Sequence, residues 1–184
     1  MAEADGPVTE AVRQAAERLA RRLAVPLTSV QFAERRLEDW LAAFRGRQLV
    51  EAWRAHGEWI DAWRPPLGPG VAARFAAARA TPEREALPAG AAAAAVLEAL
   101  ERVLPSGGAL VMPSAVTVAP WPELAEPVKA DLRRRTMRLT CVAGLARAPA
   151  VSLPLASVGG LPVGLCLLAR PGEDERLLAA ARIA

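Results

Sequence analysis

Five serines, one lysine, one histidine and two cysteines are the residues of this chain best suited to nucleophilic or acid–base chemistry. A serine hydroxyl is a weak nucleophile at neutral pH, so hydrolysis by serine needs an adjacent base that takes its proton. None of the serines stands in a Gly-Ser-Ser-Gly-like loop or a Gly-x-Ser-x-Gly elbow. They are Ser29, Ser106, Ser114, Ser152 and Ser157. We therefore predict no catalytic residue within these positions.

The candidate bases have ordinary explanations. Lys129 lies close to Glu126 and Asp131, which predicts a solvated ion pair, and His56 falls in a tryptophan-rich helix that predicts a packed or capping side chain. We expect no metal site, because no His/Cys/Asp/Glu cluster has ligand spacing, and no bound cofactor. Cys141 and Cys166 lie in apolar stretches, which is typical of buried thiols in a reducing compartment.

Composition bounds the class of protein. The 184 residues are 53% hydrophobic and 23% charged, as expected for one globular domain over residues 1–184, mainly helical over 1–80 and a helix–strand core over 81–184. Arginines are interleaved with acids rather than gathered in a basic stripe, which argues against nucleic acid. We also expect no secretory signal, no membrane partner and a cytoplasmic location, since no apolar run approaches the about 20 residues of a membrane span.

Apolar spacing and turn residues predict a helix-rich chain. Gly46 should bend or break the long second helix, and Thr81 is a candidate N-cap for a helix that begins at Pro82. The tryptophans of the second helix are expected to lie in the core or in an interface. The predicted helices are Pro7–Leu23, Glu34–Trp63, an alanine-rich helix ending at Ala80, Ala89–Leu104, Pro127–Ala146 and Glu173–Ala184.

Four short apolar runs predict strands. Leu27–Phe32 has β-branched alternation, whereas Ala109–Met112, Ala150–Leu155 and Val163–Leu168 are uniformly apolar and should share one sheet. Gly159-Gly160 is suited to close a hairpin between the last two runs. Helices that alternate with such strands place the chain in the α/β class.

Motifs in the last third of the chain resemble a known family. They are Leu110-Val-Met-Pro-Ser114, Ala143-Gly-Leu145, Pro149-Ala-Val-Ser-Leu-Pro154, Leu161-Pro-Val-Gly-Leu165 and Gly172-Glu-Asp-Glu-Arg-Leu-Leu178. Their order resembles the carboxy-terminal part of the amidase signature family, the Ser-Ser-Lys amide hydrolases. The resemblance implies that the chain forms part of a helix-rich α/β/α fold built on a large mixed sheet. The chain departs from the family at two places. Family members commonly carry an acidic residue where this chain has Gly108-Ala109, and an Asn where it has Thr140-Cys141.

A shorter match concerns the amino-terminal half. His56-Gly-Glu-Trp-Ile60, followed by Leu67-Gly-Pro-Gly70, resembles the indole-acetamide hydrolase branch of that family. The Gly/Ser-rich segment that carries the family's nucleophilic serine, its cis-peptide serine and its lysine is absent from these residues. The resemblance therefore implies a truncated amidase, inactive alone, that would hydrolyse a carboxamide C–N bond only if a missing amino-terminal half were supplied.

The same resemblance implies a substrate-binding loop. In the family this part of the chain walls the acyl pocket through the loop after the Pro113-like position. Thr117 and Trp121 are the expected substrate-binding residues, with Val116 and Pro120 as neighbours that shape the loop; ordinary loop packing is the alternative for each. The ligand would be a small amide.

The chain also admits a non-catalytic interpretation. A partial amidase fold exposes sheet edges and apolar helix faces, and such surfaces recruit partners. Tryptophan is enriched at interface hot spots, so the tryptophans at 40, 53, 59 and 63 would anchor a binding or scaffold module. Under either interpretation we expect a homo-oligomer or a complex with a missing half rather than a monomer.

Overall fold

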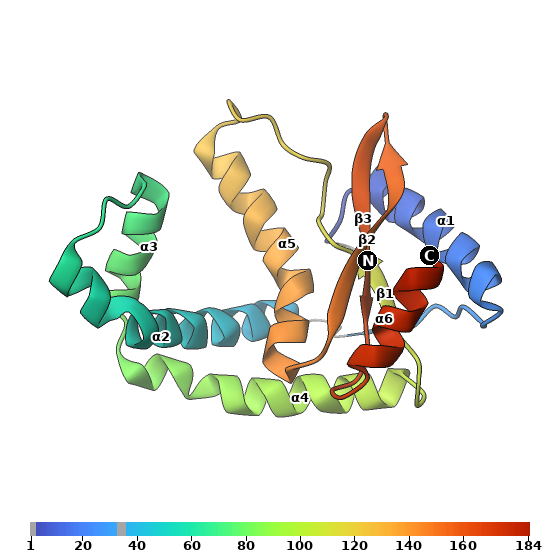
Figure 1. Ribbon diagram of the computed structural model, residues 1–184, viewed down its shortest axis with the longest axis horizontal. Helices are drawn as coiled ribbons and strands as arrows, with labels where there is room; N and C mark the ends of the chain where they lie inside the picture. The colour runs from blue at the N-terminus through green and yellow to red at the C-terminus, as the bar shows by residue number, and fades with distance from the viewer. Residues whose placement is uncertain (1–2, 33–35) are drawn as a thin grey trace.

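The computed structural model describes residues 3–32 and 36–184 (Figure 1). A three-stranded sheet stands between helix α5 on one side and helices α1 and α6 on the other, with α2 and α4 running beneath (Figure 1). The helices are α1 (Gly6–Leu23), α2 (Leu37–Trp63), α3 (Pro69–Ala80), α4 (Pro88–Val103), α5 (Glu126–Ala146) and α6 (Asp174–Ile183), with a 3₁₀ turn at Glu83–Ala86. The strands are β1 (Leu110–Pro113), β2 (Ala150–Val158) and β3 (Leu161–Leu168).

The three uniformly apolar runs form one sheet, as predicted. Strand β3 lies in the centre and pairs antiparallel with both β1 and β2, so Leu168 faces Leu110 on one side and Ala150 on the other. The central position explains why Leu165 and Leu168 are fully buried. The Gly159-Gly160 hairpin is also confirmed: both residues have positive φ, at 57° and 80°, the geometry of the turn that matches strand twist.

Helices α1, α2, α4, α5 and α6 contribute buried apolar residues to a common core, whereas α3 does not. In α1 the stripe repeats every three to four residues, and acidic and basic side chains occupy the outer face. The buried stripe of α1 comprises Val8, Val12, Ala15, Ala16, Leu19 and Ala20. Buried residues of α1, α2, α4, α5, α6 and all three strands form a single hydrophobic cluster. The division at residue 80 remains a prediction.

Three local expectations were wrong. Leu27–Phe32 is irregular and its Leu27 and Val30 side chains are exposed, because no neighbouring strand offers it a hydrogen-bonding partner within the described residues. Gly46 does not interrupt α2, which is continuous from Leu37 to Trp63. Thr81 caps no helix: its hydroxyl donates back to the Ala77 carbonyl, and only a 3₁₀ turn follows. Glu34, the predicted start of the second helix, lies outside the described residues.

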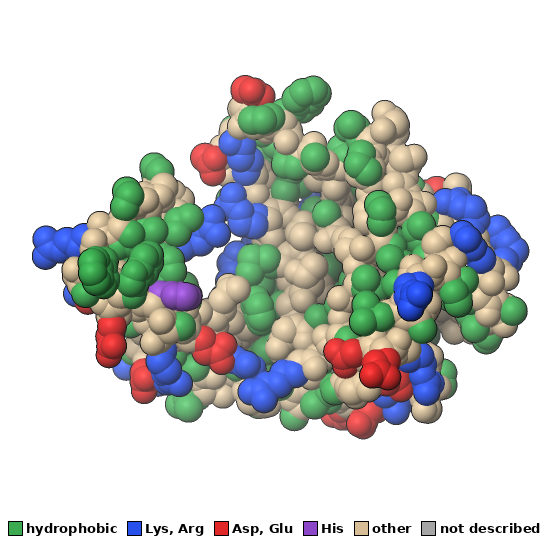
Figure 2. Space-filling view, viewed as in Figure 1, with side chains coloured by type: hydrophobic (Ala, Val, Ile, Leu, Met, Phe, Trp, Pro, Cys, Tyr) green, Lys and Arg blue, Asp and Glu red, His purple; other side chains and the backbone are tan. Residues whose placement is uncertain are grey.

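The end of α2 and the whole of α3 together form an arm (residues 53–80) that projects from the rest of the molecule, with α3 packed across the end of α2 (Figure 1). Of the tryptophans predicted for core or interface, Trp40 is buried in the core and Trp53 is half-buried on the arm. Trp59 and Trp63 are 50% and 76% exposed, and Figure 2 shows hydrophobic side chains gathered over this arm. The core therefore takes only the first of the four.

Candidate functional site

The loop between β1 and α5 is the segment expected to bind a substrate, and its first residue is fixed to the sheet. The Ser114 amide donates to the carbonyl of Gly164 at 2.9 Å, and the hydroxyls of Ser114 and Ser152 lie 2.6 Å apart. A Cβ at Gly164 would lie 2.6 Å from both hydroxyl oxygens. Glycine at 164 is therefore what lets the two serines meet on this face of the sheet.

A second set of contacts fixes the loop two residues later. Val116 is fully buried; its amide donates to the Thr136 hydroxyl of α5 at 3.4 Å, and its carbonyl accepts from the Asp5 amide at 2.8 Å. The Asp5 carboxylate accepts from the Arg135 guanidinium at 2.9 Å. This hydrogen bond, assisted by the nearby Thr117 hydroxyl, lowers the pKa of Asp5, although partial burial opposes the shift.

The two predicted substrate-binding residues lie in different surroundings. Thr117 is half-buried in the fixed base of the loop, whereas Trp121 is 77% exposed near its tip. The Trp121 carbonyl accepts from the Leu124 amide at 3.1 Å, so the tip is a turn that returns the chain toward α5. The loop rises beside the sheet and crosses to the start of α5 (Figure 1). Val116 is buried in the base of the loop, and Pro120 is exposed next to the tryptophan.

Among the described residues, neither Ser114 of the loop nor Ser152 of β2 makes a hydrogen bond to a basic side chain. Lys129 pairs with Glu126 at 3.2 Å in the first turn of α5, as predicted. His56 is exposed and meets Phe75 edge-on, with ring centroids 5.9 Å apart, so it packs rather than caps. The Ser114–Ser152 pair has no hydrogen bond to either residue among the described contacts. Two hydroxyls without a proton acceptor remain weak nucleophiles.

The thiols are equally unsuited to attack. Cys141 and Cys166 are buried and unpaired, and burial raises the pKa of each to about 11, which keeps both protonated at neutral pH. Over residues 3–32 and 36–184, no group of three His, Cys, Asp or Glu side chains is placed to hold a metal ion. In the same residues, no helix is both long and apolar enough to cross a membrane.

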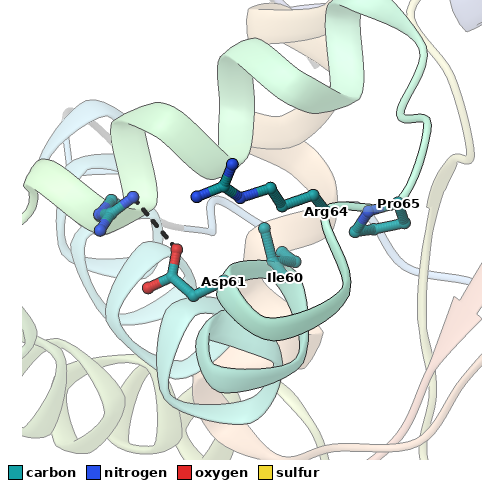
Figure 3. Close-up of a pocket in the computed structure, with 5 residues that line it drawn as sticks. Ile60, Asp61, Arg64 and Pro65 are labelled. Atoms are coloured by element: carbon teal, nitrogen blue, oxygen red, sulfur yellow. Dashed lines mark ion pairs between the residues drawn. The ribbon is translucent and has the colours of Figure 1, made fainter.

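A hollow elsewhere on the surface also lacks a nucleophile. It lies at the junction of α2 and α3, is open, and is lined by Ile60, Asp61, Arg64, Pro65 and Arg79 (Figure 3). Its ion pair joins Asp61 to Arg79 at 3.2 Å, and the Arg79 guanidinium lies 5.4 Å from the centre of the Trp53 ring. This arrangement braces the arm and offers no group that attacks a carbonyl.

Sequence reasoning missed the residues that hold the loop. Asp5 and Arg135 stand far apart in the chain, and neither belongs to a motif that points to the other. Ser114 and Ser152 are also far apart in the chain, and their pairing follows from the register of β3 between β1 and β2. The nearest signal was Gly164, a glycine inside an apolar strand, which often marks a close approach.

Several known amidases are similar in sequence. The chain is 34% identical over 135 residues to Amidase 1 of Oryza sativa subsp. japonica, covering 73% of this chain and 31% of that protein. It is 33% identical over 125 residues to Amidase 1 of Arabidopsis thaliana, covering 67% and 29%. A 44-residue stretch is 52% identical to a glutamyl-tRNA(Gln) amidotransferase subunit of Methanothermobacter thermautotrophicus, covering 24% and 10%. No family model matches the chain.

Solved structures extend the likeness to nearly the whole chain. A crystal structure of an amidase superimposes with a TM-score of 0.71 at 25% identity, covering 97% of this chain and 42% of that one. A bacterial aryl acylamidase of the amidase signature family shares the fold, with a TM-score of 0.56 at 16% identity and coverages of 96% and 41%. The chain spans about a third or less of the length of the Amidase 1 relatives.

Proposed function

Because the chain belongs to the amidase signature family, we propose that it supplies the carboxy-terminal, non-catalytic part of an amide hydrolase. The observation that carries the proposal is the 34% identity to Amidase 1 over 135 residues. The reaction is hydrolysis of a carboxamide C–N bond. The serine nucleophile and its lysine base would belong to another segment, since in the described part of the chain the Ser114–Ser152 pair has no hydrogen bond to a base and Lys129 is paired with Glu126.

Within that enzyme, we propose that the loop from Ser114 to Leu124 walls the acyl pocket. Its base is held by the sheet and by α5, while Trp121 at the tip offers a large, exposed apolar ring. Thr117 lies at the base and Trp121 near the tip, so the two would contact different parts of one acyl group. An aryl or indole acyl group suits the tryptophan, because stacked or edge-on aromatic pairs are favourable.

A partner chain or segment is part of the proposal. One relative is named as an amidotransferase subunit, which supports an amidase-like chain that works inside an assembly. A cytoplasmic location also belongs to the proposal, and the two unpaired, buried thiols are compatible with a reducing compartment.

The first test is hydrolysis of indole acetamide and aryl acetamides by the purified chain, alone and mixed with the amino-terminal, Ser-Ser-Lys-bearing part of an amidase relative. We expect no turnover by the chain alone and turnover in the mixture. A mixture in which the relative's nucleophilic serine is replaced by alanine should be inactive. Turnover by the chain alone that disappears on Ser152→Ala, Ser114→Ala or Ser106→Ala would overturn the proposal.

The second test concerns the pocket. In the complemented enzyme, Trp121→Ala should raise KM for an aryl amide while kcat changes little, because the ring binds the acyl group and takes no part in bond breaking. Trp63→Ala is the matched control, since that side chain is equally exposed, at 76% against 77%, but lies on the α2–α3 arm. Equal effects of the two substitutions would remove Trp121 from the pocket.

A non-catalytic binding module is the second candidate, and one observation favours it. Trp59 and Trp63 remain 50% and 76% exposed on the arm, where the fold buries neither. This alternative would be identified by two results together. The mixtures with the wild type and with Trp121→Ala would both show no turnover, and the chain would bind a partner in a way that depends on Trp59 and Trp63.

A further inference from the structure

We infer that Asp5, at the amino-terminal end of α1, is a positioning residue that sets the conformation of the substrate loop and thereby the placement of Thr117 and Trp121. Asp5 makes contacts with both the loop and α5, and these contacts carry the inference. Its consequence for catalysis rests on the proposed function above.

Asp5 contacts the loop through its backbone. Its amide donates to the Val116 carbonyl at 2.8 Å, and Val116 is fully buried, so this point of the loop cannot move without exposing an apolar side chain. The Thr117 hydroxyl lies near enough to the Asp5 carboxylate to help lower its pKa. Two successive loop residues therefore face one aspartate.

The carboxylate of Asp5 ties the same point to α5. It accepts from the Arg135 guanidinium at 2.9 Å, and Arg135 also donates to the Glu3 carbonyl at 2.9 Å. Because the loop runs from β1 to α5, Asp5 connects the base of the loop to the helix in which the loop ends. Charge-assisted hydrogen bonds of this kind are stronger than neutral ones.

Asp5 performs this role instead of the one its position predicts. Aspartate is a preferred N-cap residue, because its carboxylate can accept from the free amides of the first helical turn. Asp5 is the N-cap of α1, yet its side chain makes no capping hydrogen bond. The carboxylate is turned toward Arg135 and the loop, so the cap is given up for a tertiary contact.

The neighbouring charges favour the ionised aspartate. Arg138 of α5 pairs with Glu3 at 2.9 Å and with Glu38 of α2, and Arg134 pairs with Glu38 at 3.2 Å. These pairs give the guanidinium groups at 134 and 138 other carboxylate partners, and Asp5 is the carboxylate that pairs with Arg135. Asparagine at position 5 would keep the size and the backbone contact and would remove the charge.

Hydrogen exchange of the isolated chain tests the inference without reference to activity. Asp5→Asn and Arg135→Gln should each speed exchange of loop amides at 116–124 by at least about tenfold, the size expected for losing hydrogen bonds to a charged group. Exchange in β3 should stay unchanged. Glu10→Gln is the matched control, because it removes an exposed ion pair with Arg13 on the same helix and should leave the loop unaffected.

Two results would overturn the inference: loop exchange unchanged in Asp5→Asn, or exchange raised equally in β3 and the loop, which would indicate general destabilisation. If Arg135→Gln also lowers stability, Arg135→Lys is the conservative variant to compare with it. Because lysine keeps the positive charge opposite Asp5, Arg135→Lys should retain part of the loop protection that Arg135→Gln loses. In a complemented enzyme Asp5→Asn should raise KM more than it lowers kcat. An inactive mixture together with fast loop exchange would reject the proposed function and leave Asp5 as the positioning residue.

Discussion

Gly164 is the residue on which the start of the loop depends, because it leaves space for two serine hydroxyls beside the central strand. We predict that Gly164→Ala lowers the free energy of unfolding by about 1–3 kcal/mol, since the new Cβ would lie 2.8 Å from Ser114 Cβ and must displace that strand end. Urea denaturation measures the change.

A double-mutant cycle supplies the control for Gly164. Ser114→Gly removes both Ser114 atoms that the new methyl group would meet. The double variant Ser114→Gly/Gly164→Ala should therefore lose less free energy of unfolding than the sum of the losses in the two single variants. Strict additivity would contradict the steric explanation.

The two thiols give a second prediction about single residues. Burial raises the pKa of Cys141 and Cys166 to about 11, and a protonated thiol is not the alkylated species. At pH 8 we expect iodoacetamide to label neither cysteine in the native chain over the time in which it labels both in urea. Mass spectrometry of the quenched protein would detect fast native labelling, which would contradict the burial of these side chains.

Among the helices, α2 runs through Gly46 without a break, and this glycine instead leaves room for a neighbouring element to pack against the helix. A Cβ at this position would overlap the Glu85 carbonyl oxygen, so the 3₁₀ turn packs directly on the helix backbone. The same residue type that predicts an interruption from sequence instead marks a close approach of two elements.

We predict that Gly46→Ala destabilises the chain by about 1–2 kcal/mol, even though alanine favours a helix by up to ~1 kcal/mol over glycine. Gly90→Ala in α4 is the matched control, because nothing lies within 4 Å of its added Cβ, and it should be neutral or slightly stabilising. Thermal unfolding of both variants tests the difference. A stabilised Gly46→Ala variant would mean that the 3₁₀ turn moves away without loss.

For the molecule as a whole, exposed apolar surface predicts association. Burying one large apolar side chain contributes roughly 1.5–3 kcal/mol, and Trp59, Trp63 and Trp121 are at least half exposed. A domain is stable by only about 5–15 kcal/mol, so such surface favours a partner. Light scattering at micromolar concentration should report a dimer or larger species.

The association prediction has its own control. Replacing Trp59 and Trp63 by glutamine should weaken association and reduce binding of a hydrophobic dye, while Trp121→Gln should affect association less if the arm is the contact surface (Figure 2). A wild-type monomer of 19.4 kDa that binds no dye would reject the prediction.

Local patterns were sufficient for much of the fold. The stripe of α1, the apolar strands and the Gly159-Gly160 turn were all predicted, because each depends on residues close together in the chain. The family resemblance was likewise carried by contiguous motifs. The strand predicted over Leu27–Phe32 was wrong for a related reason. Its alternation suits a strand, but a strand also needs a neighbouring strand to pair with, which local sequence does not supply.

Tertiary structure alone decided how the candidate site is held. Whether Ser114 meets Ser152 depends on the register of three strands, and whether Asp5 caps its helix or binds Arg135 depends on where α5 lies. In each case a side chain has several satisfactory partners, and only distant backbone brings one within hydrogen-bonding reach. Residue types and spacing thus determined the elements and the family, while long-range packing selected among the partners available to each polar group.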